Sequence, residues 1–208
     1  MQSGERVLCT QCRLALPETN DHRNPQTTTS INKFAGKVPI AYVLSYAHFR
    51  KGGLLQQVIH QIKYRGQQEA ARELGRWYGH QLKQETSLCN EWDLLVGVPM
   101  HKSRYRQRGY NQAELIAEGL AESMDIPVGR DVLRRTHFKA SQIRKSRVER
   151  WENVKTVFSV QNAAEIHQKR IVLVDDVLTT GATLEACAVE LLRAGSQSVS
   201  IITLGATV

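Results

Sequence analysis

The chain has 208 residues, of which 41% are hydrophobic and 23% are charged, so it can bury one sizeable core and is not disordered throughout. No apolar stretch approaches the roughly 20 residues of a membrane-spanning helix, no basic-then-apolar leader stands at the start, and the four cysteines suggest no disulfide framework. We therefore expect a cytoplasmic protein without membrane insertion. The net charge of +8 is uneven, because twelve Lys or Arg residues face six Asp or Glu residues between His101 and Arg150. This excess would attract a diphosphate, a nucleotide or a nucleic acid, unless it is an ordinary solvated surface.

Residues 1–36 differ from the rest of the chain. They hold the pair Cys9-x-x-Cys12 and then a polar stretch, Glu18 to Asn32, that is rich in Thr, Asn and Pro and is typical of a loop or linker. Ordered patterns begin near Val38. We therefore predict two parts, residues 1–36 and a main domain at residues 37–208.

Strands and helices alternate through the main domain. Apolar residues at helical spacing predict helices at 53–64, 69–82, 111–124 and 182–194. Apolar or aromatic runs predict strands at 42–49, 93–99, 171–174 and 199–204. This alternation predicts an α/β fold, with a central, mainly parallel sheet flanked by helices.

The strand at 171–174 is followed directly by two carboxylates, Asp175 and Asp176, and then by a small, hydroxyl-rich loop. The loop comprises Thr179, Thr180, Gly181, Ala182 and Thr183. Carboxyl ends of parallel strands are where open α/β sheets bind ligands, and a loop leading into a helix N-terminus offers amides to a phosphate. The carboxylates suit ribose hydroxyls and a hydrated Mg²⁺ ion. These residues predict a sugar-phosphate site; the alternative is an Asp-rich turn before a capped helix.

A second candidate site follows the strand at 93–99. It comprises Pro99, Met100, His101, Lys102 and Arg104. Because it also follows a buried strand, we expect it at the same edge of the sheet. Its cationic groups suit a diphosphate. Arg106 and Arg108 continue the basic run, and their alternate spacing could direct some of these side chains to solvent.

The stretch from Ile171 to Thr183 resembles, over 13 positions, the phosphoribosyl-pyrophosphate (PRPP) signature of type I phosphoribosyltransferases. The resemblance implies that fold, with PRPP phosphate bound by residues 179–183. It also implies Mg²⁺ held by Asp175 and Asp176, through water, and pyrophosphate held by the loop after the strand at 93–99.

The segment Arg108-Gly109-Tyr110-Asn111-Gln112 narrows the resemblance to the ComF (competence protein F) branch of that fold. Alternatively, Asn111 is a helix N-cap and Gly109 a turn residue. A second ComF-like pattern of Arg, Thr, Gln, Arg and Asn lies between Arg134 and Val154. It contains Gln142, Lys145, Arg147, Arg150 and Asn153.

In the wider fold a mobile loop closes over the site at this stage of the chain. We therefore name Lys145 and Arg147, with Asp175 and Asp176, as candidate catalytic residues. The alternative is an exposed basic hairpin or helix without ligand contacts.

ComF-like proteins often carry a zinc ribbon with two Cys-x-x-Cys pairs ahead of the main domain. Only one pair, Cys9 and Cys12, is present here, so we predict a remnant of that ribbon and no bound zinc, because structural zinc requires four ligands.

Three functions remain open. The first is phosphoribosyl transfer from PRPP to an unknown acceptor, usually a nitrogen nucleophile, bound by a hood within residues 40–90. The second is non-catalytic sensing of PRPP or a nucleotide. The third is a competence factor that binds single-stranded DNA, with bases stacked on Tyr105, Tyr110 and Trp151. Related folds often dimerise, so a homodimer is one of the possible oligomeric states.

Overall fold

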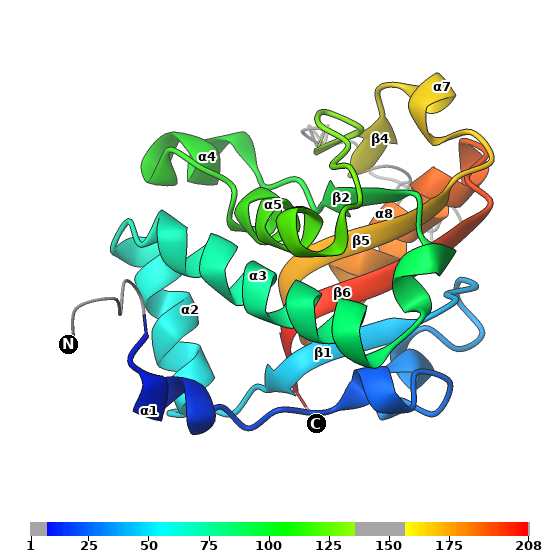
Figure 1. The fold of residues 1–208 in the computed structure, drawn as a ribbon. Coiled ribbons are helices and arrows are strands. Elements are labelled where there is room, and N and C mark those ends of the chain that lie inside the picture. Colours follow the sequence, from blue (N-terminus) through cyan, green and yellow to red (C-terminus); the bar gives the residue numbers. More distant parts are fainter. Residues whose placement is uncertain (1–7, 136–156, 208) are drawn as a thin grey trace.

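A four-stranded parallel sheet forms the centre of the protein (Figure 1). The computed structural model describes residues 8–135 and 157–207. The strands lie in the order β1-β6-β5-β2, and each neighbouring pair is parallel. Their bounds are β1 Val43–His48, β2 Leu94–Gly97, β5 Arg170–Leu178 and β6 Ser198–Ala206. The predicted α/β class with a mainly parallel sheet is therefore confirmed.

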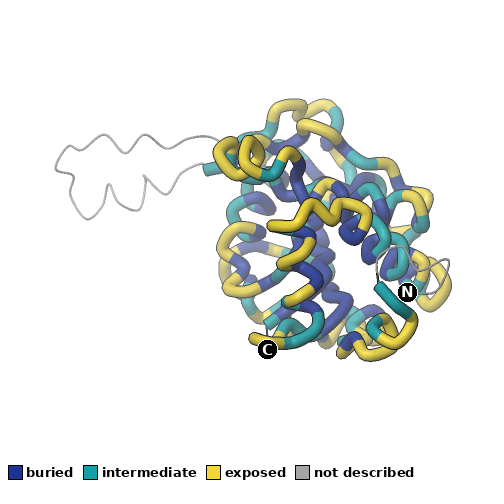
Figure 2. The backbone as a smooth tube through the Cα atoms, turned by 90° about the vertical axis from the view of Figure 1, so that its left-hand side faces the viewer, coloured by how far each residue is buried: buried dark blue, intermediate teal, exposed yellow. Residues whose placement is uncertain are grey.

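Helices cover both faces of this sheet. In Figure 1, α3 and α5 cross one face and α8 lies behind the other. The first face packs against α2 (Leu54–Tyr64), α3 (Gln68–Glu85) and α5 (Gln112–Met124), and the second packs against α7 (Ala163–Ile166) and α8 (Ala182–Arg193). Successive β5 residues serve opposite faces, because Val172 packs with the first group and Leu173 with the second. This two-sided burial explains the continuous apolar run of β5, and Figure 2 shows the buried segments gathered inside.

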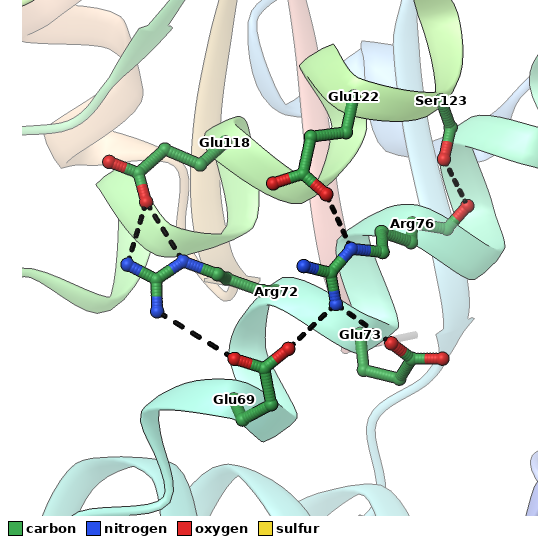
Figure 3. Close-up of polar contacts among 7 residues, drawn as sticks. All are labelled: Glu69, Arg72, Glu73, Arg76, Glu118, Glu122 and Ser123. Atoms are coloured by element: carbon green, nitrogen blue, oxygen red, sulfur yellow. Dashed lines mark hydrogen bonds and ion pairs between the residues drawn. The ribbon is translucent and has the colours of Figure 1, made fainter.

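The α3 and α5 helices approach each other closely. A Cβ atom on Gly119 would lie 2.0 Å from the Arg72 carbonyl oxygen, and one on Gly75 would lie 2.4 Å from the Ile116 carbonyl oxygen. Arginines of α3 also pair with glutamates of α5, as Figure 3 shows for Arg72 with Glu118. The two helices therefore pack together as one layer over the sheet.

Two elements differ from their sequence predictions. β5 continues through the acidic pair to Leu178 instead of ending at Val174, because the neighbouring strand β6 keeps pairing with it. The basic residues after β2 were expected in a loop, with side chains pointing alternately to the site and to solvent. They form instead a helix, α4 (Lys102–Arg108). A separate two-stranded antiparallel sheet, β3 (Leu133–Arg135) with β4 (Phe158–Val160), lies beyond the main sheet.

The N-terminal segment packs along the edge of β1. Glu18 forms an antiparallel bridge with Ala47, and the Ser45 amide donates to the Asp21 carboxylate at 3.0 Å. The segment contains α1 (Thr10–Leu14) and the 3₁₀ helices η1 (Asp21–Arg23) and η2 (Thr29–Lys33); a third, η3 (Leu88–Glu91), follows α3. The polar stretch expected to be loop or linker therefore contains two helical turns and contacts the domain.

The zinc-ribbon remnant is not confirmed. Cys9 is the N-cap of the five-residue α1, and its Sγ atom accepts from the Cys12 amide at 3.4 Å. Across residues 8–135 and 157–207, no three His, Cys, Asp or Glu side chains are grouped so that they could hold a metal ion. Cys187 is fully buried in α8, and this burial raises the pKa of its thiol. Within the same ranges, no helix has the length and apolar character to cross a membrane.

Candidate functional site

A cavity of about 280 Å³ opens at the carboxyl edge of the sheet. The end of β5, the turn after β2, α4, the start of α5 and the end of α2 all contribute to its walls. The two candidate sites identified in the sequence therefore share one pocket.

The acidic pair forms one wall of this pocket. Asp176 is 7% exposed, and the Asp175 Oδ1 atom accepts from the Asp176 amide at 2.8 Å. Burial raises the pKa of Asp175 well above its ordinary range, and the Asp176 charge raises it further. The Lys63 ammonium, at the end of α2, forms an ion pair with the Asp176 Oδ2 atom. A half-buried carboxylate, Asp175, and a buried one, Asp176, are thus held side by side with one cation.

The predicted phosphate loop lies next to the acidic pair and leads into α8. Gly181 is the N-cap of α8 with a φ of 82°, and the Ala182 amide lies 3.5 Å from the Thr180 hydroxyl that accepts from it. Thr179 and Thr180 are exposed, and Thr183 contributes to the pocket wall. A helix N-terminus of this kind favours anions.

The predicted pyrophosphate segment divides between two surfaces. Pro99, Met100 and Arg104 contribute to the pocket, whereas Lys102 contributes to a neighbouring cavity. His101 is the N-cap of α4, and its side chain accepts from the Ser103 amide at 3.2 Å.

The helical form of the basic run decides which arginines reach the pocket. Arg104 and Arg108 are four residues apart and therefore share one face of α4, which contributes to the pocket wall. Lys102 and Arg106 share the face toward the neighbouring cavity.

The ComF-like motif joins α4 to α5. Gly109 ends α4 with a φ of 80°, and the Asn111 side chain caps α5 by accepting from the Ala113 amide at 3.1 Å. The Asn111 Nδ2 atom also donates to the Val98 carbonyl at 3.1 Å. Arg108 donates to Gln112 at 2.9 Å, and both side chains line the pocket. The motif therefore serves both the local turn and the site.

Tyr110, the central motif residue, is buried, and its hydroxyl donates to the Ile62 carbonyl. The DNA-binding hypothesis predicted that a base stacks on Tyr110, and the burial of this side chain excludes that role.

Several pocket residues were not given a site role by the sequence, among them Lys63 and Arg135. Lys63 lies within the hood predicted at residues 40–90, and its ion pair with Asp176 could not be anticipated across such a sequence separation. Arg135 ends β3, and its guanidinium lies 5.4 Å from the Phe158 ring centroid.

Several predicted site residues lie outside the described ranges. They are Gln142, Lys145, Arg147, Arg150 and Asn153.

Comparisons with known proteins relate this chain to a phosphoribosyl transferase domain and to competence and DNA utilization proteins. Residues 110–206 match the phosphoribosyl transferase domain family. Competence protein F of Haemophilus influenzae is 27% identical over 164 residues, which are 78% of this chain and 66% of that protein. DNA utilization protein YhgH of Escherichia coli is 29% identical over 203 residues, which are 95% of this chain and 83% of that protein. These matches support a ComF-like family of the phosphoribosyltransferase type.

For this ComF-like chain, the family match includes Asn111, Gln112, the acidic pair and the phosphate loop. It does not include Lys63 or the segment from Pro99 to Arg104. A glutamine PRPP amidotransferase from B. subtilis, solved with ADP and GMP, is similar over 64% of this chain and 26% of that one, with 24% identity and a TM-score of 0.45.

Proposed function

We propose that this protein binds PRPP and transfers its phosphoribosyl group to a nitrogen acceptor, with release of pyrophosphate. The observation that carries this proposal is the pocket in which Asp175 and Asp176, the N-terminus of α8 and two arginines of α4 meet. Carboxylates suit hydroxyls, helix amides suit a monophosphate, and guanidinium groups suit a diphosphate. PRPP carries all three groups.

Each part of the pocket has a role in this proposal. The loop at 179–183 binds the 5-phosphate, and the acidic pair accepts hydrogen bonds from the ribose hydroxyls. Arg104 and Arg108, with the turn at Pro99 and Met100, hold the pyrophosphate. His101 is the N-cap of α4, and Lys102 faces the neighbouring cavity.

Magnesium suits the donor set, since Mg²⁺ prefers oxygen ligands, keeps several waters and needs only one or two carboxylates beside substrate phosphates. Asp175 and Asp176 would hold it, and it would supply charge stabilisation for the leaving pyrophosphate.

The reaction exchanges one bond at C1 of the ribose for another. The C1–oxygen bond to pyrophosphate breaks with its electron pair leaving on pyrophosphate, and the acceptor nitrogen forms the new bond to C1. Arg104 and Arg108 stabilise the negative charge that gathers on the leaving group. The acceptor enters beside Tyr64, which is 60% exposed and whose ring centroid lies 5.1 Å from the Arg108 guanidinium.

Binding of PRPP tests the proposal directly. PRPP with Mg²⁺ should raise the free energy of unfolding by about 2.7 kcal/mol at a hundredfold excess over the dissociation constant. Asp175→Asn and Asp176→Asn should each weaken this stabilisation. Asp125→Asn, in an exposed carboxylate at the end of α5, is the matched control. Wild-type PRPP affinity in both pocket variants would contradict the proposal.

Turnover requires a separate measurement. Pyrophosphate release from PRPP, measured with a panel of nitrogen acceptors, should depend on the acceptor. PRPP binding without release for any acceptor would instead favour the sensing function.

Binding of single-stranded DNA is the second candidate, favoured by the surface of α4. Residues 102–107 are all exposed, and they include Lys102, Arg106 and Tyr105, which is 50% exposed. Cations interleaved with an exposed aromatic ring suit a phosphate backbone and a stacked base. Oligonucleotide affinity should therefore fall steeply with salt, and the double variant Lys102→Ala with Arg106→Ala should reduce the slope. No binding at low salt would exclude this function.

A further inference from the structure

Lys63 pairs with a carboxylate that the pocket buries. Its Nζ atom contacts the Asp176 Oδ2 atom, and the two side chains are 24% and 10% exposed. Both residues also form part of the pocket wall, so the pair faces the space in which a ligand would bind. In residues 8–135 and 157–207, no second ion pair of Asp176 is found.

The helix that carries Lys63 is fixed on two sides. Ile59 and Ile62 are buried in the core beneath α2, and the Ile62 carbonyl accepts from the Tyr110 hydroxyl. Lys63 lies in the last turn of α2, where the helix dipole favours a cation. The backbone that carries Lys63 is therefore fixed beside the pocket.

A buried carboxylate is costly without a compensating charge. Beside two aspartates that suit Mg²⁺, this compensation would ordinarily come from a divalent cation or from the solvent. Lys63 supplies it from within the chain. The unliganded pocket then needs no metal to place a cation against Asp176.

We propose that Lys63 is a built-in cation at Asp176, and that it reduces the dependence of sugar-phosphate binding on a divalent cation. This inference rests on the proposed PRPP site and adds a positioning residue to it. Removing the ammonium should leave the Asp176 carboxylate without a neighbouring cation. Mg²⁺ can replace that cation, so PRPP binding should become more dependent on magnesium.

The experiment compares wild type with Lys63→Met and Lys63→Arg. The dissociation constant of PRPP is measured by calorimetry in excess EDTA and again in millimolar Mg²⁺. We expect the ratio of the two constants to be about tenfold larger in Lys63→Met than in wild type, within the usual range for energetic coupling between ligands. Lys63→Arg keeps a cation and should retain a ratio close to that of wild type.

Lys83→Met is the matched control. Lys83 also lies in the last turn of a helix and pairs with an aspartate, but its partner Asp125 is exposed and remote from the pocket. This variant should keep the wild-type ratio. Circular dichroism and thermal unfolding of all four proteins establish that each is folded.

A second readout uses no sugar phosphate. Mg²⁺ alone, titrated into the unliganded proteins, should raise the melting temperature of Lys63→Met more than that of wild type. Equal magnesium responses in these two proteins, with PRPP binding intact, would overturn the role of Lys63 and leave the proposed function standing. If wild type binds PRPP neither in EDTA nor in Mg²⁺, both the role of Lys63 and the proposed function are overturned.

Discussion

Gly181 meets two constraints at the start of the phosphate loop. Its φ of 82° is in the left-handed region, and a Cβ atom there would lie 3.1 Å from two ring atoms of Phe34. Gly181→Ala should therefore lower the free energy of unfolding by about 1–2 kcal/mol through the backbone alone. It should also weaken PRPP binding, because the first amides of α8 would shift. Urea denaturation and PRPP titration measure the two effects.

Gly52→Ala is the control for this prediction. Gly52 has a φ of 76°, but a Cβ atom there would meet nothing within 4 Å. This variant should lose stability and keep PRPP affinity. Wild-type PRPP affinity in Gly181→Ala would show that Phe34 and the glycine do not position the loop.

The sequence predicts those site residues that are neighbours in the chain. Asp175, Asp176 and the loop at 179–183 lie beside one another because one strand and one turn carry them all. Lys63 was not placed against Asp176, since their pairing depends on how α2 packs on the sheet. Local order can be predicted from local pattern, whereas a contact between distant segments requires the fold.

At the scale of elements, glycines set the distance between α3 and α5. Gly119→Ala would place a methyl group 2.0 Å from the Arg72 carbonyl oxygen, so one helix must move. We expect a loss of about 1–3 kcal/mol in the free energy of unfolding, as for overpacked cores. Chemical denaturation measures this loss.

Glu122→Ala separates close packing from ion pairing in the same helix. Glu122 is 51% exposed and pairs with Arg76, which also contacts Glu69 and Glu73 (Figure 3). Its removal should cost less than about 1 kcal/mol, because exposed ion pairs contribute little. A greater loss in Glu122→Ala than in Gly119→Ala would reverse this ranking.

A pH-sensitive contact joins β2 to β5 at their amino ends, away from the pocket. Asp93 accepts from the Arg170 amide at 2.8 Å and from the Arg170 guanidinium at 2.7 and 3.0 Å. The Arg170 guanidinium and amide lower the pKa of Asp93 from 3.8 to about 2. The folded state thus favours the ionised carboxylate, and this stabilisation is complete above pH about 4 and lost as pH falls toward about 2.

Asp93→Asn should consequently be less stable than wild type at neutral pH, and the difference should shrink between pH about 4 and about 2. Thermal unfolding across this range measures it, with Asp125→Asn as an exposed control. A difference that stays constant down to pH about 2 would contradict the assigned pKa.

Element positions were predicted well where apolar spacing is strong. The helices expected at 53–64, 69–82, 111–124 and 182–194 agree with α2, α3, α5 and α8 within a few residues. The far end of β5 was missed because aspartates are rare in strands, and pairing with β6 outweighs that preference. The helix α4 was missed because its arginines show charge alternation and carry no apolar stripe.

At the scale of the whole molecule, the N-terminal segment completes the sheet and the site. β1 is an edge strand, and such edges are prone to pairing with other chains unless they are covered. Residues 17–21 cover this edge, with the His48 amide donating to the Pro17 carbonyl at 2.8 Å. Further along, Phe34 is 1% exposed and packs against Gly181 of the phosphate loop. The segment therefore contacts both the exposed edge of the sheet, at β1, and the candidate ligand site, at Gly181.

Deleting residues 1–36 tests whether the main domain at 37–208 is complete alone. The deletion removes the buried side chains of Leu16 and Phe34, each worth about 1.5–3 kcal/mol of burial. Their sum is a large fraction of the 5–15 kcal/mol that typically stabilises a domain. We expect a lower urea midpoint, more aggregation through the uncovered β1 edge, and weaker PRPP binding.

The double variant Leu16→Ala with Phe34→Ala separates these effects, because it removes the two buried side chains and keeps the backbone that covers β1. It should lose stability and PRPP affinity but remain soluble. A truncated chain with the wild-type urea midpoint and PRPP affinity would show that residues 37–208 fold and bind independently, and that the contacts of the N-terminal segment contribute nothing to either property.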